Sequence, residues 1–569
     1  MTRISFRLAP LALALLAALP QAHADTPPAA SEAAALGELK ATTLALIDAL
    51  VEQGLLTRAK ADELLRKAKA AGEAVAAGNP APLPAETGWG APRSVVRVPY
   101  LSDSTRAKIK DEVRNEVLIA AREEGWTDGR RLPGWLRSVS IDGDIRVRAQ
   151  DEMFANDNVA PEIFRAQTDS PAWAPDLSNT RNDRQRATLR ARVGFHAKAS
   201  DSFSGTLRLA TGSTSGSPTS ESVTAGNDAN RFSIGVDRAS VRWEPLQGNR
   251  LDAGRMGVPF DGSDLTWPDD MGLDGLAGHG ELDMASGLFG FATAGGFALS
   301  EFANSQKDKS LVGGQLGLDW AFGDAWQLRV AAGAYNFRNV QGVREDVIPP
   351  TGALAGVSPY QNSAYPAAIR QKGNTLINLN APNSAFPQNA IPAPVWGLAS
   401  RFKPVDFTLS LTARHYNPYE VNFSFHVVKN TGFDNDDIQR RAGTTAVADL
   451  KEMTLGYQAR LQFGHAKLVE PGQWQVFAAY RKLERDAWID AYTDTTWHLG
   501  GTNYKGFSVG GQYAFDNKAT LGLRFTSTRN LDDGVRFLSI PGDASSISGN
   551  LSSAPLKIDV LQLETNLKF

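Results

Sequence analysis

The stretch RATLRARVGFHAKA, residues 186–199, decides the fold class of this protein. Its odd-numbered positions are all apolar, while its even-numbered positions, glycine 194 apart, are polar or charged. Successive side chains of a β-strand point to opposite faces, so this strand has one apolar face and one charged face. Such a strand fits a wall with lipid on one side and water on the other, although a soluble sandwich strand can also alternate.

Repetition along the chain favours the membrane wall. The same alternation, with occasional slips such as the one near Asp237–Arg238, returns in fifteen further segments, at about residues 138–149, 202–212, 231–244, 249–258, 273–283, 287–300, 310–322, 325–338, 405–416, 419–430, 451–464, 473–486, 501–515, 517–530 and 556–569. Most of them exceed the ~9–11 residues that cross a membrane at a tilt. We therefore predict an all-β transmembrane fold for residues 131–569, a closed antiparallel outer-membrane β-barrel of sixteen strands. Pairing of Val395–Lys403 would make eighteen strands.

The connections between these segments alternate between seven short turns and eight long loops. Outer-membrane barrels have short periplasmic turns and long outer loops, so both chain ends are expected in the periplasm. The longest loop spans about residues 339–404. Loops of this length are usually functional or disordered, and this one could cap the pore, fold into it or cover a neighbouring protomer.

The first 24 residues have the pattern of a signal peptide. Arg3 and Arg7 precede the apolar run Leu8–Leu19, and Ala22-His23-Ala24 follows as a small-x-small cleavage site. We therefore expect an exported protein whose mature chain begins at Asp25.

Residues 25–130 are expected to form a helical segment in the periplasm. Helical 3,4 spacing joins Leu36, Leu39, Thr43, Leu46 and Leu50. A Pro/Ala/Gly-rich linker follows at Gly72–Pro92, and another helix is expected at Ser104–Glu124. Two interpretations remain open, a helical hairpin that packs on itself and a coiled coil that joins protomers.

The composition excludes several classes of protein. The chain has 569 residues with 59 basic and 62 acidic side chains, and its charge of −3 excludes a strongly basic nucleic-acid binder. Its longest apolar run, Leu8–Leu19, is too short for a membrane-spanning helix, which excludes an α-helical membrane protein. With no cysteine, the chain has no disulfides, thiol catalysis or cysteine-based metal site.

Four short motifs give the chain a family resemblance. They are Leu132–Trp135, Ile141–Arg148, Val428–Phe433 and Gly501–Phe507. With these motifs, the chain resembles the bacterial "putative porin" family of outer-membrane barrels with an N-terminal helical segment. The resemblance implies a passive diffusion channel in a Gram-negative outer membrane, commonly a trimer, and it implies no particular substrate and no catalytic residue.

Arginines dominate the polar face that is predicted to line the lumen. They are Arg146, Arg148, Arg190, Arg192, Arg208, Arg242, Arg329, Arg414, Arg460 and Arg524, whereas the inward acids are Asp142, Asp144, Asp406 and Glu564. An arginine wall can favour anions, because guanidinium stays charged and binds carboxylate or phosphate as a fork. The alternative is that these arginines pair with acids on the loops and only keep the lumen wet.

The third long loop, Pro259–Gly272, carries four aspartates and no Lys or Arg. They are Asp261, Asp264, Asp269 and Asp270. General sixteen-stranded porins resemble this arrangement, since their third loop folds inward with its acids facing arginines on the wall. We therefore hypothesise that this loop narrows the pore.

Two further features concern partners. The C-terminal Phe569 ends an amphipathic strand and resembles the signal read by the outer-membrane assembly machinery. The acidic run Asp434–Asp437 is expected either to be a solvated surface or to bridge through a divalent cation to lipopolysaccharide. The expected partners are outer-membrane lipid, lipopolysaccharide, the assembly machinery and further copies of the chain, and nucleic acid is not among them.

The sequence is also compared with two other classes of outer-membrane barrel, an enzyme and a structural tether or adhesin. An outer-membrane enzyme is disfavoured because no G-x-S-x-G or HExxH context surrounds any histidine. A structural tether or adhesin would use the N-terminal helices to bind a periplasmic partner. We expect no catalytic residue, no metal site and no cofactor.

Overall fold

The computed structural model describes residues 138–159, 179–303, 307–323, 325–343, 362–379, 395–442, 450–532, 535–538, 549–551 and 555–569. These residues all belong to the compact unit Val96–Phe569, which is distinct from the unit Met1–Val95. The expected signal peptide (residues 1–24), the helical segment and coiled-coil alternative (25–130) and the motif Leu132–Trp135 lie outside the described residues.

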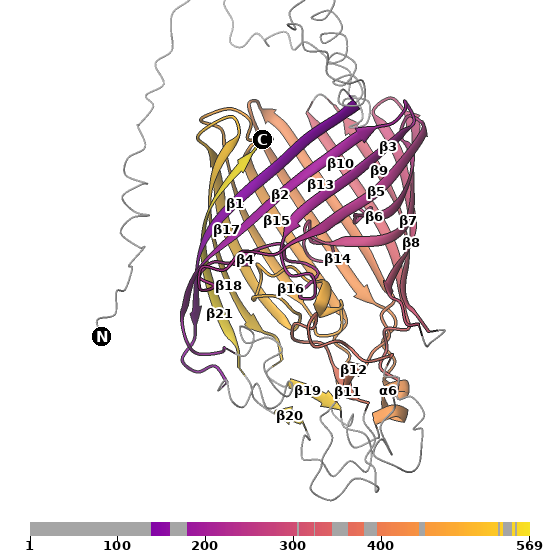
Figure 1. The fold of residues 1–569 in the computed structure, drawn as a ribbon, viewed down its shortest axis with the longest axis vertical. Helices are drawn as coiled ribbons and strands as arrows, with labels where there is room; N and C mark the ends of the chain where they lie inside the picture. Colours follow the sequence, from indigo (N-terminus) through magenta and orange to yellow (C-terminus); the bar gives the residue numbers. More distant parts are fainter. Residues whose placement is uncertain are drawn as a thin grey trace, which may run out of the picture. The chain divides into compact units, whose positions relative to one another are not determined.

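Sixteen antiparallel strands form a closed barrel, which confirms the predicted fold class (Figure 1). Each predicted segment corresponds to one of them. The strands are β1 (Val139–Phe154), β2 (Arg184–Lys198), β3 (Phe203–Thr211), β5 (Ile234–Leu246), β6 (Asn249–Gly257), β7 (Gly272–Ala285), β8 (Leu288–Ser300), β9 (Lys309–Phe322), β10 (Trp326–Arg338), β13 (Pro404–Tyr416), β14 (Tyr419–Asn430), β15 (Leu455–His465), β16 (Trp474–Leu483), β17 (Tyr504–Ala514), β18 (Ala519–Asn530) and β21 (Lys557–Lys568). The short β4 (Val223–Thr224) pairs with β2 beyond the end of β3.

The alternative of eighteen strands is wrong. Trp396–Leu398 forms β12, which pairs with β11 (Leu376–Asn378) in a separate small sheet at the long-loop end (Figure 1). This sheet is completed by β19 (Val535–Leu538) and β20 (Gly549–Leu551), so it joins the longest loop to the last loop. Val395–Lys403 therefore pairs within the loops, apart from one isolated bridge between Phe402 and Phe337 of β10.

The outward side chains of the wall are mostly apolar, as the alternation predicts. Ile145, Val147 and Leu316 are exposed on this face, and the rings of Trp320 and Phe322 lie 4.7 Å apart near the short turns. Aromatic side chains at the edge of the apolar band suit the membrane–water interface. Among the described residues, no helix is long and apolar enough to cross a membrane.

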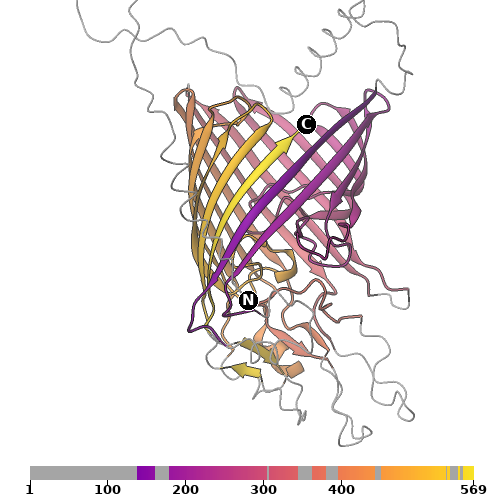
Figure 2. The same ribbon diagram turned by 60° about the vertical axis from the view of Figure 1, so that its left-hand side comes forward.

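The barrel closes where the last strand meets the first (Figure 2, yellow beside indigo). The β1–β21 ladder runs from Asp144 opposite Lys568 to Phe154 opposite Ile558. The main chains of Gly143 and Phe569 exchange two further hydrogen bonds, of 3.2 and 3.1 Å. Hydrocarbon offers no hydrogen-bond partner to an open strand edge, so these last pairs complete the wall.

Closure at this seam leaves no room for a side chain at position 143. A Cβ on Gly143 would lie 2.5 Å from the Arg192 carbonyl oxygen and 2.5 Å from the Phe569 ring. We expect Gly143→Ala to destabilise the barrel by about 1–3 kcal/mol, because overpacking forces a backbone shift. The midpoint of urea unfolding in detergent or lipid, followed by gel mobility of the folded form, measures this effect.

Gly205→Ala is the matched control, because a Cβ there meets only the Ser240 carbonyl oxygen at 3.8 Å. Equal unfolding midpoints for the two variants would show that the seam tolerates a side chain.

Candidate functional site

Loop 3, residues 258–271 between β6 and β7, leans on the wall of β9, β10 and β14. The Asp261 main-chain NH donates to Gln315 at 2.7 Å, and Arg329 donates to the Asp261 carboxylate at 2.7 Å. Ser263 and His426 are hydrogen-bonded at 2.8 Å. Loop 3 therefore reaches into the lumen instead of remaining at the rim.

A buried charged anchor of loop 3 is the pair of Asp264 and Arg481. Arg481 on β16 lies 2.7 Å from the Asp264 carboxylate, and its side chain is fully buried. The guanidinium also stacks over the Trp497 ring at 4.4 Å and donates to Gln458 at 2.7 Å. A buried guanidinium requires a counterion, and Asp264 provides it.

The far end of loop 3 faces β1 and β2. Arg190 donates to Asp270 at 2.8 Å and to Asp144 at 2.8 Å, so it joins the loop to the wall. Arg192 also contacts Asp144, at 2.5 Å. Asp269 is exposed, and its carboxylate has no ion pair among the residues that the structure describes.

Apolar packing holds the middle of loop 3 in the barrel. Trp267 contacts the rings of Tyr335 on β10, at 5.2 Å, and Trp488, at 4.8 Å. Leu265 and Met271 are also buried in this cluster. Aromatic pairs contribute about 0.5–1.5 kcal/mol each beyond the area that they bury, so the cluster stabilises the inward position of the loop.

Trp488 belongs to loop 7, residues 484–503 between β16 and β17, which packs against the longest loop. Lys372 of the longest loop donates to the carbonyl oxygens of His498 and Gly500 at 2.6 and 2.8 Å, and Tyr365 donates to Asp490. Burial lowers the pKa of Lys372 to about 7 and raises the pKa of Asp490 to about 6. The described part of the longest loop is thus joined to loop 7 by buried polar contacts.

Seven of the ten arginines that are predicted to line the lumen have a carboxylate partner within 4.0 Å. The pairs are Arg148 with Glu564, Arg190 with Asp144 and Asp270, Arg192 with Asp144 and Glu221, Arg208 with Asp237 and Glu221, Arg242 with Asp252, Arg329 with Asp261 and Asp319, and Arg414 with Glu420. Of the other predicted acids, Asp142 contacts His196 and Asp406 contacts His426.

The other three arginines have no carboxylate oxygen within 4.0 Å among the described residues. Arg146 donates to Ser222 at 2.7 Å. Arg460 and Arg524 lie over the ring of Phe477 at 3.9 and 5.2 Å. The wall therefore combines paired arginines with arginines whose charge is not neutralised by a direct neighbour.

The sequence analysis missed several charged residues of the lumen. They are Glu221, Asp237, Arg238, Asp252, Asp319 and Arg481. Asp252 and Asp319 follow the alternation and could have been found from it. Asp237 and Arg238 both contribute to the lumen because a bulge interrupts the β3–β5 register, and the slip in the pattern was its only signal.

The acidic run Asp434–Asp437 has a local structural role that the sequence analysis did not foresee. It leads into helix α6 (Asn435–Ala442), and Asp434 accepts a hydrogen bond from the Asp437 main-chain NH at 3.0 Å. Asp437 also pairs with Arg441 one turn later, at 3.1 Å. Helix capping and ion pairing thus engage these two carboxylates.

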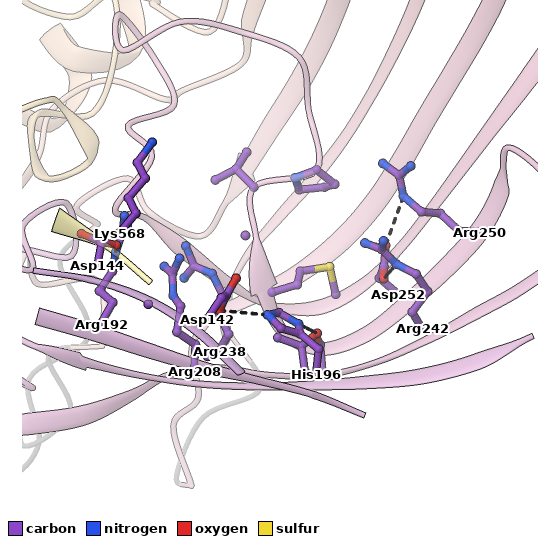
Figure 3. Close-up of a pocket in the computed structure, with 18 of the residues that line it drawn as sticks. Asp142, Asp144, Arg192, His196, Arg208, Arg238, Arg242, Arg250, Asp252 and Lys568 are labelled. Carbon is purple, nitrogen blue, oxygen red and sulfur yellow. Dashed lines mark hydrogen bonds and ion pairs between the residues drawn. The ribbon is translucent and has the colours of Figure 1, made fainter. Parts of the chain in front are cut away.

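A cavity of about 630 Å³ lies along the wall of β1, β2, β3, β5 and β6, next to the start of loop 3 (Figure 3). Its charged lining comprises six basic residues and three acidic ones: Arg192, Arg208, Arg238, Arg242, Arg250, Lys568, Asp142, Asp144 and Asp252. Arg242 and Arg250 share one carboxylate, that of Asp252, at 2.7 and 3.5 Å. The cavity is therefore polar and carries an excess of positive charge.

A barrel with an apolar outer face, a charged inner face and an inward third loop defines an outer-membrane β-barrel of the porin type. A family model described as "Putative porin" matches residues 40–569, and the chain belongs to this family. The chain is accordingly a protein of the outer membrane.

Solved structures with a similar fold include three porins, each matched over 76% of this chain. They are OprB of Pseudomonas putida at high pH (8% identity, 94% of that chain, TM-score 0.40), OmpF of Salmonella typhi with daunomycin (10%, 97%, 0.36) and an anion-selective porin from Comamonas acidovorans (8%, 99%, 0.36). None of the curated proteins matches the chain.

The contact between Asp264 and Arg481 is expected to contribute to the stability of the barrel. Asp264→Asn leaves the buried guanidinium of Arg481 without its counterion, so we expect a loss of about 3 kcal/mol in the free energy of unfolding. The double variant Asp264→Asn with Arg481→Met should lose less, because it buries no uncompensated charge. Urea unfolding of the three proteins forms the comparison.

Asp201→Asn, at a short turn where the carboxylate is fully exposed, is the control and should unfold like the native chain. A double variant that is less stable than Asp264→Asn would contradict the assigned role of Asp264.

Proposed function

We propose that this porin forms a water-filled channel for passive diffusion of small hydrophilic solutes and ions. The observation that carries the proposal is the charged lumen: inward arginines and aspartates surround a cavity of about 630 Å³ beside loop 3. Charged side chains on the inner face of a barrel keep it wet and set its selectivity. The proposal includes no catalytic step and no cofactor.

The channel favours anions in this proposal. The cavity has six basic residues against three acidic ones, and Arg146, Arg460 and Arg524 add charge that no described carboxylate neutralises within 4.0 Å. Guanidinium groups bind carboxylates and phosphates in a planar fork. The pore-lining role of the ten predicted arginines is part of this proposal.

Loop 3 is the constriction in this proposal. Asp261 and Asp264 attach it to the β10 and β16 walls, whereas Asp270 faces Arg190 and Asp269 is exposed. Carboxylates and guanidinium groups on opposite sides of a narrow passage produce a transverse field, which orients dipolar solutes and disfavours apolar ones.

The assembly around the channel also remains a proposal. We propose a homotrimer that contacts lipopolysaccharide and other outer-membrane lipid, with residues 25–130 in the periplasm and Phe569 as the signal for the assembly machinery. The exposed ring of Phe569 at the barrel seam supports its accessibility in the folded state. The tether or adhesin alternative has no support in the described residues.

The first test is single-channel conductance of the refolded mature chain in planar bilayers, with the reversal potential across a salt gradient. We expect stable openings in steps of three and a reversal potential of the sign that anion selectivity gives. Arg242→Gln should reduce that potential, because it removes one charge from the cavity. Lys518→Gln, in a short turn, should change it little.

Asp269→Asn with Asp270→Asn tests the constriction in the same bilayers, and we expect stronger anion selectivity and a changed conductance. A barrel that inserts without conducting would overturn the channel. Unaltered conductance and selectivity in the aspartate variant would overturn the role of loop 3.

The pH dependence of selectivity follows from Glu221, in the loop between β3 and β5. Burial, together with the charges of Asp270 and Asp237, raises the pKa of Glu221 to about 7. This carboxylate beside Arg192 and Arg208 is therefore protonated as the pH falls from 8 to 6, and the lumen gains positive charge. We expect the reversal potential to shift toward anions over this range.

Glu221→Gln should show the anion-favouring potential already at pH 8 and lose most of the shift. Glu470→Gln, in an exposed turn, should retain the shift. A native channel whose reversal potential is constant between pH 6 and 8 would contradict the assignment to Glu221.

A further inference from the structure

Four basic side chains lie directly opposite one another across four neighbouring strands. The register pairs Lys482 of β16 with Lys505 of β17, Lys505 with Arg529 of β18, and Arg529 with Lys557 of β21. All four lie at the end of the barrel that carries the long loops. We refer to Lys482, Lys505, Arg529 and Lys557 as the cationic row.

The cationic row is on the outer face of the barrel. Leu483 and Tyr504, which alternate with Lys482 and Lys505 along their strands, are completely buried on the inner side. Tyr480 and Phe507, two residues away on the same face as the row, are exposed to 42% and 46%. The row therefore faces the membrane and not the lumen.

Within the described part of the chain, carboxylates lie beside two of the four members of the row. Lys482 pairs with Glu484 at 2.8 Å, and Lys557 lies 3.6 Å from Asp559. Lys505 and Arg529, the two central members, have no carboxylate oxygen within 4.0 Å in the described part of the chain. Like charges directly opposite one another destabilise a sheet, so such a row favours an external polyanion.

Aromatic and apolar side chains lie next to the row on the same outer face, toward the centre of the membrane. Tyr480 pairs with Phe507 directly beneath Lys482 and Lys505. Val509, Leu523 and Leu563 continue the apolar surface, and each is about 40% exposed. A cationic band above an apolar band is complementary to an amphiphile with an anionic head group and hydrocarbon chains.

Resting on the lipopolysaccharide contact of the proposed function, we propose that the cationic row binds the phosphorylated sugar head group of lipopolysaccharide in the outer leaflet. The long-loop end of an outer-membrane barrel faces outward, where lipopolysaccharide is the phosphorylated lipid. Ammonium and guanidinium groups make strong charge-assisted hydrogen bonds to phosphate oxygens. Four strands at a spacing of ~4.8 Å extend over ~14 Å, which suits two phosphates on one head group.

The cationic row and the apolar band together indicate lipopolysaccharide as the ligand. A free phosphate ion would use the row but not Tyr480 and Phe507, whereas an uncharged lipid would use only the apolar band. The site is separate from the lumen, so it provides attachment to the surrounding lipid without blocking the channel.

The test is binding of diphosphoryl lipid A to the full mature chain in detergent micelles, measured by native mass spectrometry. Lys505→Gln with Arg529→Gln should weaken binding about tenfold or more, since it removes both cations without a described ion pair. The matched control, Lys467→Gln with Lys518→Gln, removes the same charge from short turns next to the same strands and should bind like the native chain.

Dephosphorylated lipid A should bind the native chain as weakly as diphosphoryl lipid A binds the double variant, and inorganic phosphate should compete only in part. Unchanged single-channel conductance shows that the double variant is folded. Equal lipid A binding by the two double variants would overturn the proposal. So would full competition by inorganic phosphate, or a changed oligomeric state with unchanged lipid binding, which would assign the row to a subunit contact.

Discussion

Backbone hydrogen bonding in hydrocarbon is the constraint on which the rest of this structure depends. A strand edge left open in the membrane has no water to pair its NH and carbonyl groups, so the sheet must close. Here β21 closes on β1, and the ladder ends with the main-chain contacts of Gly143 and Phe569. Once the sheet is closed, successive side chains along each strand face the lipid and the lumen in turn.

Closure creates an electrostatic problem inside the barrel, because inward arginines on neighbouring strands repel one another. The wall solves part of it with its own acids, as in the contacts of Arg242 with Asp252 and of Arg148 with Glu564. Loop 3 provides further acids, since its aspartates contact Arg190, Arg329 and Arg481. The loop stays in place because Trp267 packs in an aromatic cluster within the barrel.

The outer face has a different solution to the problem of like charges. Inside the lumen, most arginines have a carboxylate within 4.0 Å, whereas Lys505 and Arg529 on the outer face have none among the described residues. The lumen is bounded by protein, so its counterions can be built into the chain. The membrane interface contains anionic lipid instead, so cations on the outer face can bind the head groups of the surrounding lipid.

The sequence by itself determined the wall. Its two-residue period predicted the strands, with a number of sixteen or eighteen, and the inward face that carries Arg146 and Arg190. The pairing of loop acids with wall arginines came from the tertiary structure. Asp264 and Arg481, for example, are more than 200 residues apart and meet only after closure. Helix α6 and the small sheet also escaped the sequence analysis, since short loop elements are stabilised by contacts such as Asp437 with Arg441 and not by periodicity. Periodicity in the sequence predicts the face of the sheet on which a side chain lies. The residues that the side chain contacts are determined only by the closed fold.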